Sequence, residues 1–145
     1  MLLRGSICGV QFDTKLAVVL REDLAVWQKA NVTAFLVSGI AGAAPELVGE
    51  PYEDASGNRY LPMFRQPVLV YGADAAGLRR VYERAMQRGA ELAIYTNELF
   101  TTGHDEANRA AVAAVAAAEL DLVGLALRAD RKLVDKILDR LEPHP

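Results

Sequence analysis

Four short apolar segments alternate with four longer segments of helical character, and this alternation constrains the fold more than any other feature of the chain. The apolar segments lack regular polar alternation, which is typical of strands that are covered on both faces. A repeated strand–helix order predicts an α/β protein, here a three-layer α/β/α sandwich around a sheet of four to five strands. The expected strands are residues 15–21, 67–73, 90–96 and 119–128, and the expected helices run from about 29 to 39 or 42, from 74 to 87, from 105 to 118 and from 130 towards 143.

Two segments stand out from this alternation. The first expected helix carries apolar residues on nearly every face, which predicts a helix that is either central to the fold or shared with a partner. Residues 43–67 are irregular, and the turn-forming residues 54–58 lie between two strand-like pieces, so we expect a hairpin or a long surface loop. The second helix should be capped by Asp74 and ended by Gly89. Its predicted inner stripe is Leu78, Val81, Tyr82, Ala85 and Met86.

Composition narrows the class of protein. The 145 residues suit one domain, with a net charge of −3 and a pI near 5.4. That balance argues against a protein built around a nucleic-acid backbone, although a local basic patch on residues 79–88 stays open. Cys8 is the only cysteine and is expected to be a small buried side chain. The start of the sequence, with Arg4, has no apolar run of a signal peptide, and no apolar stretch reaches the roughly 20 residues of a membrane span. A cytoplasmic protein is expected.

Polar side chains are concentrated between Thr96 and Arg109, in the turn after the third expected strand. One interpretation is helix capping, in which Thr102 or Asp105 accepts free backbone N–H groups and Asp105 pairs with Arg109 one turn later. The other is a ligand site, because ligands of open α/β sheets bind outside the carboxyl ends of strands and a helix N-terminus can hold an anion. The proton-transfer candidates in this turn are Glu98 and His104, and its ligand-binding candidates are Thr96, Thr102, Asp105 and Asn108.

A second polar group follows the first expected strand. Lys29, Asn31 and Thr33 would share a sheet edge with the turn if the first and third strands run in the same direction. The alternative is that Lys29 is solvated and Asn31 caps the helix. No metal site is predicted, because His104, Asp105 and Glu106 are sequence neighbours whose side chains diverge. No nucleophile elbow or glycine-rich phosphate loop occurs, so no cofactor is expected.

Five pieces spread over nearly the whole chain carry a resemblance to a known family: "KLAVVLREDLAVWQKANVTAF", "YEDASGNRYLPM", "QPVLVY", "IYTNELFTTGHDEANRAAV" and "DLVGLALRADRKLVDKIL". With these pieces the chain resembles an uncharacterised bacterial family, the domain of unknown function numbered two thousand. That family looks like a branch of the type 2 peptidyl-tRNA hydrolase superfamily. The resemblance implies a mixed four-stranded sheet with helices on both faces, often paired into homodimers.

The resemblance does not extend to the functional residues of those hydrolases. Lys29 is the only lysine in the loop where they have a glycine–lysine pair, and Asn31 lies nearest to their lysine. Phe35 and Ser38 stand where they carry glutamine and histidine. Their aspartate after the third strand corresponds to Tyr95, Thr96 and Asn97, with Glu98 as the first carboxylate. The resemblance therefore implies a shared scaffold rather than a shared reaction.

Three hypotheses follow. The first is a small polar or anionic ligand between the two polar groups, with Lys29 supplying charge and Asn31, Tyr95 and Asn108 among the binding residues. The second is residual hydrolysis of peptidyl-tRNA or a related ester, with Lys29 stabilising negative charge and Glu98 or His104 orienting water. The third is a homodimeric interaction protein that buries the first helix, with Trp27 and Phe35, across its interface; the alternative is that these two residues belong to the core.

Overall fold

The computed structural model describes residues 6–7 and 10–145, and its elements follow the predicted alternation. Arg4 and Cys8 lie outside the described residues. The main sheet contains β3 (Thr14–Arg21), β6 (Val68–Ala73), β7 (Leu92–Thr96) and β8 (Leu122–Asp130), and the helices are α1 (Val26–Ala43), α2 (Ala75–Gln87), α3 (Asp105–Ala113) and α4 (Arg131–Leu138). Short 3₁₀ helices are η1 (Pro45–Leu47), η2 (Asn97–Phe100) and η3 (Ala117–Glu119), and two small strand pairs are β1 (Ser6–Ile7) with β2 (Val10–Gln11) and β4 (Tyr52–Glu53) with β5 (Arg59–Tyr60).

The main sheet is mixed, with the strand order β6-β3-β8-β7. β3 pairs in parallel with β6, whereas β8 is antiparallel to both of its neighbours, β3 and β7. Because β8 lies between them, β3 and β7 run in the same direction, and their carboxyl ends lie at one edge of the sheet. The loop that precedes α1 and the turn that precedes α3 therefore leave the sheet at a common edge. This is the condition under which the two polar groups of the sequence could form one site.

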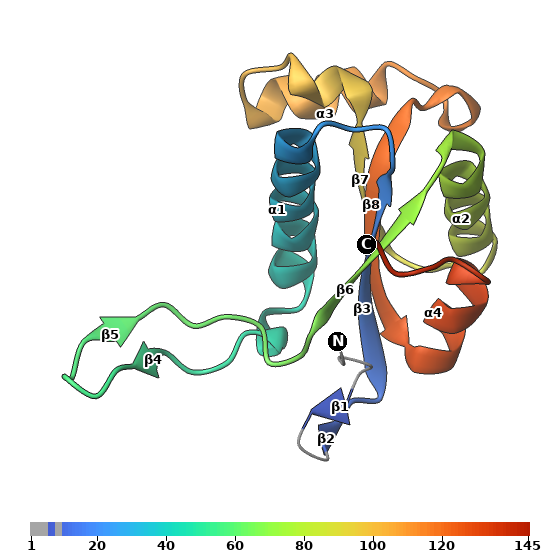
Figure 1. The fold of residues 1–145 in the computed structure, drawn as a ribbon. Helices are drawn as coiled ribbons and strands as arrows, with labels where there is room; N and C mark the ends of the chain where they lie inside the picture. The colour runs from blue at the N-terminus through green and yellow to red at the C-terminus, as the bar shows by residue number, and fades with distance from the viewer. Residues whose placement is uncertain (1–5, 8–9) are drawn as a thin grey trace.

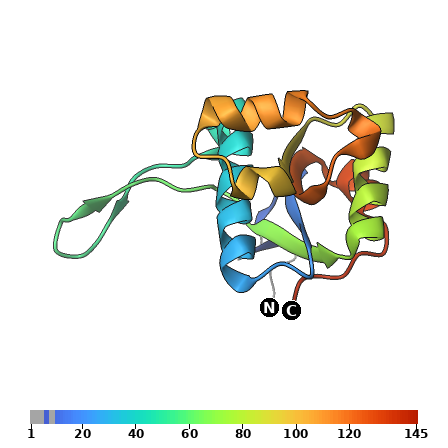
Figure 2. The same ribbon diagram turned by 90° about the horizontal axis from the view of Figure 1, so that it is seen from above.

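Helices cover both faces of this sheet, which confirms the three-layer prediction (Figures 1 and 2). α1 packs on one face, α2 and α4 pack on the other, and α3 crosses the carboxyl end of β7. The core under α1 includes Leu16, Val18, Leu20, Val32, Leu36, Ile40 and Val123. The core under α2 and α4 includes Ala17, Val19, Leu78, Val81, Leu125, Leu127, Val134 and Ile137. This alternation along β3 and β8 explains why the sequence of each strand is continuously apolar.

A glycine sets the distance between α1 and the sheet. A Cβ atom at Gly124 of β8 would lie 2.8 Å from Cγ1 of Val32 and 3.3 Å from the carbonyl oxygen of Val19. A larger residue would push α1 outward, so the close packing of the first helix depends on this position.

The boundaries of α1 differ from the prediction. The helix begins at Val26, before the expected start, and its N-cap is Ala25, which has no polar side chain. Instead, the side chain of Gln28 accepts a 2.9 Å hydrogen bond from the backbone N–H of Ala25. Because the N-cap lacks a polar side chain, the start predicted from the sequence is too late, and Asn31 is not a cap but lies in the second turn.

Other helix ends also fall earlier than predicted. α3 ends at Ala113 rather than Ala118, and β8 begins only at Leu122. The guanidinium of Arg79 donates to the carbonyl oxygens of Ala117, Ala118 and Leu120, and these bonds hold the segment as the separate turn η3.

For α2 and α4, one prediction is confirmed and two are wrong. α4 ends at Leu138, and Pro143 instead bridges to Tyr71 at the edge of β6. Asp74 caps α2 as predicted, through a 2.7 Å hydrogen bond from Gly77. Met86, predicted to face inward, is exposed.

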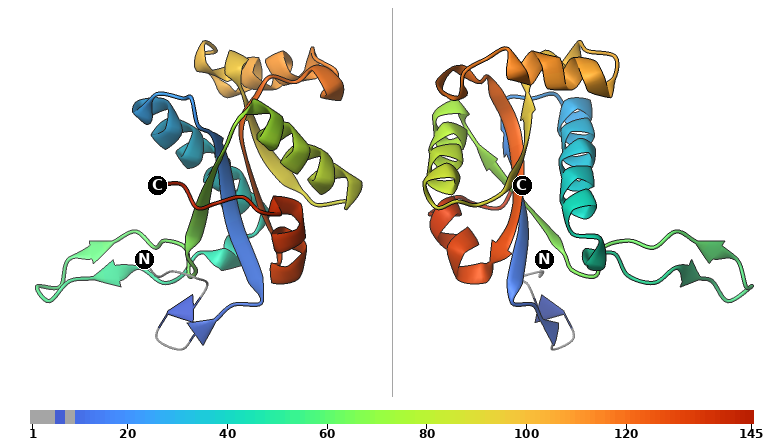
Figure 3. Two further views of the ribbon diagram at one scale, coloured as in Figure 1. Left: turned by 45° about the vertical axis from the view of Figure 1, so that its right-hand side comes forward. Right: turned by 180° about the vertical axis from the view of Figure 1, so that it is seen from behind.

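The predicted hairpin is an arm that projects away from the body of the molecule (Figures 1–3). We define the arm as residues 49–63. All residues from 50 to 61 are exposed. At its base the backbone N–H of Gly49 donates to the carbonyl oxygen of Met63 at 2.8 Å, and that of Arg65 donates to Leu47 at 2.8 Å. These bonds fix the direction in which the arm leaves the body.

Candidate functional site

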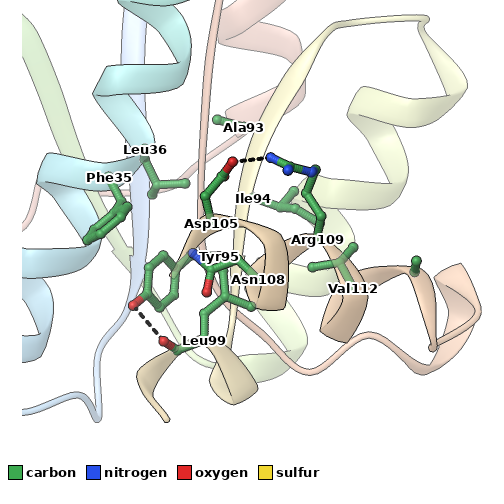
Figure 4. A pocket seen from close by; sticks show the side chains of 11 residues that line it. Phe35, Leu36, Ala93, Ile94, Tyr95, Leu99, Asp105, Asn108, Arg109 and Val112 are labelled. Atoms are coloured by element: carbon green, nitrogen blue, oxygen red, sulfur yellow. Dashed lines mark hydrogen bonds and ion pairs between the residues drawn. The ribbon is translucent and has the colours of Figure 1, made fainter. Parts of the chain in front are cut away.

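A groove lies between α1 and the η2–α3 segment, with β7 at its floor (Figure 4). It consists of two adjoining hollows of about 530 Å³ and about 450 Å³. Both are lined by Phe35, Tyr95, Leu99, Asp105 and Asn108, which makes them two parts of one groove. Its walls come from the two chain segments that the common sheet edge brings together.

The two parts of the groove differ in character. The part along β7 is mainly apolar and is also lined by Leu36, Ala93, Ile94, Arg109, Val112 and Ala113. The part at the carboxyl edge has more polar groups and is also lined by Trp27, Asn31, Ser38, Phe100, Thr102, Gly103 and His104. Among the described lining residues, the charged pair is Asp105 with Arg109, which form the predicted ion pair one helical turn apart.

Four aromatic rings surround the polar part of the groove. The ring of Tyr95 at the floor lies 5.8 Å from that of Phe35 and 5.1 Å from that of Phe100, and Trp27 lies 5.9 Å from Phe100. Tyr95 is buried, whereas Trp27 is 64% and Phe35 is 51% exposed. The interpretation of Trp27 and Phe35 as core residues is therefore wrong, because both stand on the solvent-facing rim.

The hydroxyl of Tyr95 joins the two walls. It lies 3.4 Å from Nδ2 of Asn31, which donates to it, and 3.4 Å from the carbonyl oxygen of Leu99, to which it donates. Both hydrogen bonds are long and therefore weak. Burial raises the pKa of the Tyr95 phenol, and the bond from Asn31 lowers it in part. The group therefore stays a neutral hydroxyl that can donate and accept.

The turn between η2 and α3 is held by its own side chains. Nδ1 of His104 accepts a 3.2 Å hydrogen bond from the backbone N–H of Ala107, so His104 caps the helix, in place of the predicted Thr102 or Asp105. The hydroxyl of Thr102 lies 3.1 Å from the carbonyl oxygen of Leu99 and also contacts the amide oxygen of Asn108. Capping and a ligand site are thus not exclusive here, because the capped turn is also a groove wall.

Four of the predicted site residues lie outside the groove. Nζ of Lys29 is 3.1 Å from Nε2 of His144 in the C-terminal tail, and the hydroxyl of Thr33 donates to the carbonyl oxygen of Lys29 within α1. Thr96 is 1% exposed, and its hydroxyl has no hydrogen-bond partner among the described residues. The side chain of Glu98 is exposed and does not line the groove. The structure does bring together Asn31, Tyr95, Thr102, His104, Asp105 and Asn108.

Of the four aromatic residues around the polar part, the sequence predicted Tyr95 as a binding residue but not Trp27, Phe35 or Phe100. Trp27, Asn31, Phe35 and Ser38 are spaced so that they share one face of a helix, and this spacing was the available signal. Placing the helix start after Lys29 removed Trp27 from that face.

Within the described part of the chain, no helix combines the length and the apolar character that crossing a bilayer would require. The same residues contain no group of three or more histidine, cysteine, aspartate or glutamate side chains arranged to hold a metal ion.

The fold and the groove define a three-layer α/β protein with a mixed four-stranded sheet and a hollow at the carboxyl edge of that sheet. The chain belongs to the family described as "Protein of unknown function (DUF2000)", whose model matches residues 14–145. A solved structure of a protein of unknown function from Agrobacterium tumefaciens strain C58, Atu0240, is 49% identical to it. The match covers 93% of this chain and 100% of that one, with a TM-score of 0.90. No curated protein matches the chain. The relationship to peptidyl-tRNA hydrolases stays a prediction.

Proposed function

We propose that this protein binds a small, uncharged, planar molecule with hydrogen-bonding groups in the groove between α1 and α3. The observation that carries this proposal is the set of aromatic rings around the polar part, with Trp27 and Phe35 standing exposed on its rim. Flat rings stack on exposed aromatic side chains, and burial of both surfaces favours binding. Without a ligand, these two side chains would leave a large apolar area in water.

Hydrogen-bonding groups at the floor would orient such a ligand. The side chains of Asn31 on α1 and Asn108 on α3 both line the groove, and the Tyr95 hydroxyl accepts a hydrogen bond from Asn31. A carboxamide offers both donors and an acceptor, so these two residues suit a ligand edge that also carries both kinds of group. The bonds between Asn31, Tyr95 and Leu99 are long, which leaves these groups free to exchange partners with a ligand.

The charges favour a neutral ligand over the anionic one that the sequence suggested. Lys29, the expected positive charge, contacts His144 instead, and Arg109 is paired with Asp105. The carboxylates of Asp105 and Glu106 also occupy the first turn of α3, where an anion would otherwise bind. The same placement weakens the hydrolase alternative, because Lys29 and Glu98 do not line the groove with His104.

Trp27 provides a direct test, because it is the only tryptophan of the chain and gives one indole N–H signal in an NMR spectrum. The probes are nicotinamide and nicotinate, which share a ring and differ in an amide against a carboxylate. We expect nicotinamide to shift the Trp27 signal in a saturable manner and nicotinate to bind more weakly. Asn31→Ala should weaken nicotinamide binding, and Lys29→Ala, outside the groove, should leave it unchanged. A preference for nicotinate, or a fragment library that never moves the signal, would contradict the proposal.

Self-association is a second candidate function, favoured by the surface of α1. This helix covers one face of the sheet, yet Val26 is 84% exposed, and Ala30 and Ala34 on the same side are also exposed. The central position that the sequence allowed is therefore not the reason for its apolar character, which leaves a partner as the explanation. Sedimentation equilibrium at micromolar concentrations would reveal a dimer, and a monomer throughout would contradict this function.

A further inference from the structure

The exposed large apolar side chains of the described residues are concentrated on two surfaces. Val26, Trp27 and Phe35 lie on α1, and a second group lies on the arm, whereas Met86 on α2 stands apart from both. The arm's members are Tyr52, Tyr60, Leu61 and Met63. A two-stranded hairpin without a packed face is marginally stable in water, so this arm requires a surface to pack against.

The tip of the arm is held in one conformation. The Asp54 carboxylate accepts hydrogen bonds from the backbone N–H groups of Ser56 and Asn58 at 2.9 and 3.0 Å, and from the hydroxyl of Tyr60 at 2.7 Å. These bonds hold the Tyr60 ring in place on the exposed arm. A pre-organised element loses less conformational freedom on binding, which is the property of a recognition element rather than of a solvated loop.

The arm cannot reach the α1 helix of its own chain. It leaves the body beyond the C-terminal end of α1 and points outward (Figures 1 and 3). The two backbone bonds at its base, together with the 3.1 Å bond from Nε of Arg65 to the carbonyl oxygen of Glu46, hold that direction. The surface that the arm packs against must therefore belong to another molecule.

The outward face of α1 fits the arm in chemistry. Its exposed stripe of Val26, Ala30 and Ala34 is apolar and flat, and Lys29 is the single charged residue of the helix. On the arm, a hollow of about 440 Å³ lined by Pro51, Arg59, Tyr60, Leu61 and Pro62 is of a size to receive an apolar side chain from such a face. η1 lies between α1 and the arm in the chain. In a two-fold symmetric contact, an arm that packs on α1 of the other copy implies the same contact in return.

We propose that two copies of this chain form a symmetric dimer in which the arm of each copy packs across the outward face of α1 of the other. This inference rests on the self-association proposed above and adds the segment that mediates it. It does not involve the groove, because neither the arm residues nor Val26, Ala30 and Ala34 of α1 line it.

The first test is sedimentation equilibrium of three single variants, each introducing a carboxylate at an exposed position. Leu61→Asp on the arm and Ala34→Asp on α1 should each weaken dimerisation by at least about tenfold, because the charge would be buried at the contact. Met86→Asp, exposed on α2, is the matched control and should dimerise like the unmodified chain. Circular dichroism verifies that each variant is folded.

A cross-linking experiment identifies the contact. In a Cys8→Ser background, a chain with Ala34→Cys is mixed with a chain with Leu61→Cys and oxidised mildly. The arm-on-helix dimer should give the mixed disulfide between the two variants. A dimer that survives Leu61→Asp, or that links Ala34→Cys to itself, would overturn the role of the arm while self-association stands. A monomeric unmodified chain would overturn both.

Discussion

Nζ of Lys29 lies 3.1 Å from Nε2 of His144 and joins the first helix to the last residues of the chain. Lysine can only donate, so Nε2 accepts, and the proton on Nδ1 can then be donated to the carbonyl oxygen of Pro145 at 3.0 Å. The backbone N–H of His144 also donates to Val70 at 2.9 Å. The tail is thereby attached to β6 at its edge.

Removing the lysine charge should loosen this tail. Lys29→Met keeps an apolar stem but removes the donor, so we expect a loss of about 1 kcal/mol or less from the tail attachment. Hydrogen exchange at the amide of His144 should become faster. Lys132→Met, at an exposed position of α4, is the control and should leave that exchange rate unchanged. An unchanged His144 rate in Lys29→Met would show that the backbone bonds alone hold the tail.

The arm tip should keep its order in acid. The hydroxyl of Tyr60, with Asn58, lowers the pKa of Asp54 from 3.8 to about 2. A lowered folded-state pKa stabilises the tip above the ordinary value, and this contribution is lost as the pH falls from about 4 through about 2. NMR titration of the Asp54 carboxyl should report this low pKa. Tyr60→Phe should return the pKa towards 3.8, and a pKa that stays low would assign the effect to Asn58 and the backbone bonds instead.

Tyr95 should resist ionisation in alkali. Burial raises its pKa above 10.0, and the bond from Asn31 opposes that increase. Asn31→Leu should therefore raise the pKa of Tyr95 further, because the phenolate loses a donor. Since the folded-state pKa is raised, the stabilisation is present below pH 10 and is lost as the pH rises through the folded value. Titration of the ring-carbon NMR signal, assigned by Tyr95→Phe, measures both values. A decrease in Asn31→Leu would contradict the donor role.

Gly124→Ala should destabilise the protein because the new methyl group would meet Val32 at 2.8 Å. Overpacking of this kind costs about 1–3 kcal/mol, and urea denaturation should show it. Gly42→Ala is the control. That glycine lies on an exposed turn of α1 with nothing within 4 Å of an added Cβ, so the change should stabilise the helix by up to about 1 kcal/mol. Equal effects at the two positions would refute the steric argument.

His104→Ala should destabilise α3 by about 1 kcal/mol, because the N–H of Ala107 loses its acceptor. His104→Asn supplies another capping oxygen and should recover most of this loss. Thermal unfolding of both variants gives the comparison. If both variants unfold like the unmodified protein, the cap contributes nothing measurable and the histidine would be available for the ligand alone.

The sequence predicted the elements better than their arrangement. The apolar runs of β3 and β8 identify them as buried strands, since each supplies both cores. Which strands are neighbours depends on β8 entering between β3 and β7, and no local pattern encodes that choice. The contact between Lys29 and His144 could not be predicted either, because the two residues are 115 positions apart in the chain.

The predicted site contained the floor residue Tyr95, Asn31 and the polar residues of the turn, but not the aromatic side chains on the rim. The residues of the turn, such as His104 and Asn108, are conspicuous because they are polar beside a strand end. Trp27 and Phe35 were treated as apolar residues of core or interface, and only the correct phase of α1 shows that they stand on the rim beside Asn31. Because Ala25 is not a polar cap, the predicted start of α1 is too late, so Trp27 lay outside the predicted helix and its place beside Asn31 and Phe35 was not recognised.

The position of β8 has a consequence for folding during synthesis. Synthesis delivers the N-terminal segments first, so α1 and α3 leave the ribosome before the strand that aligns them. Until Leu122–Asp130 is translated, β3 and β7 each have an unpaired edge that could pair with other nascent chains. A product truncated before this strand would contain the residues of both groove walls but could not form the groove. Its incomplete sheet would make it a substrate for quality-control proteases.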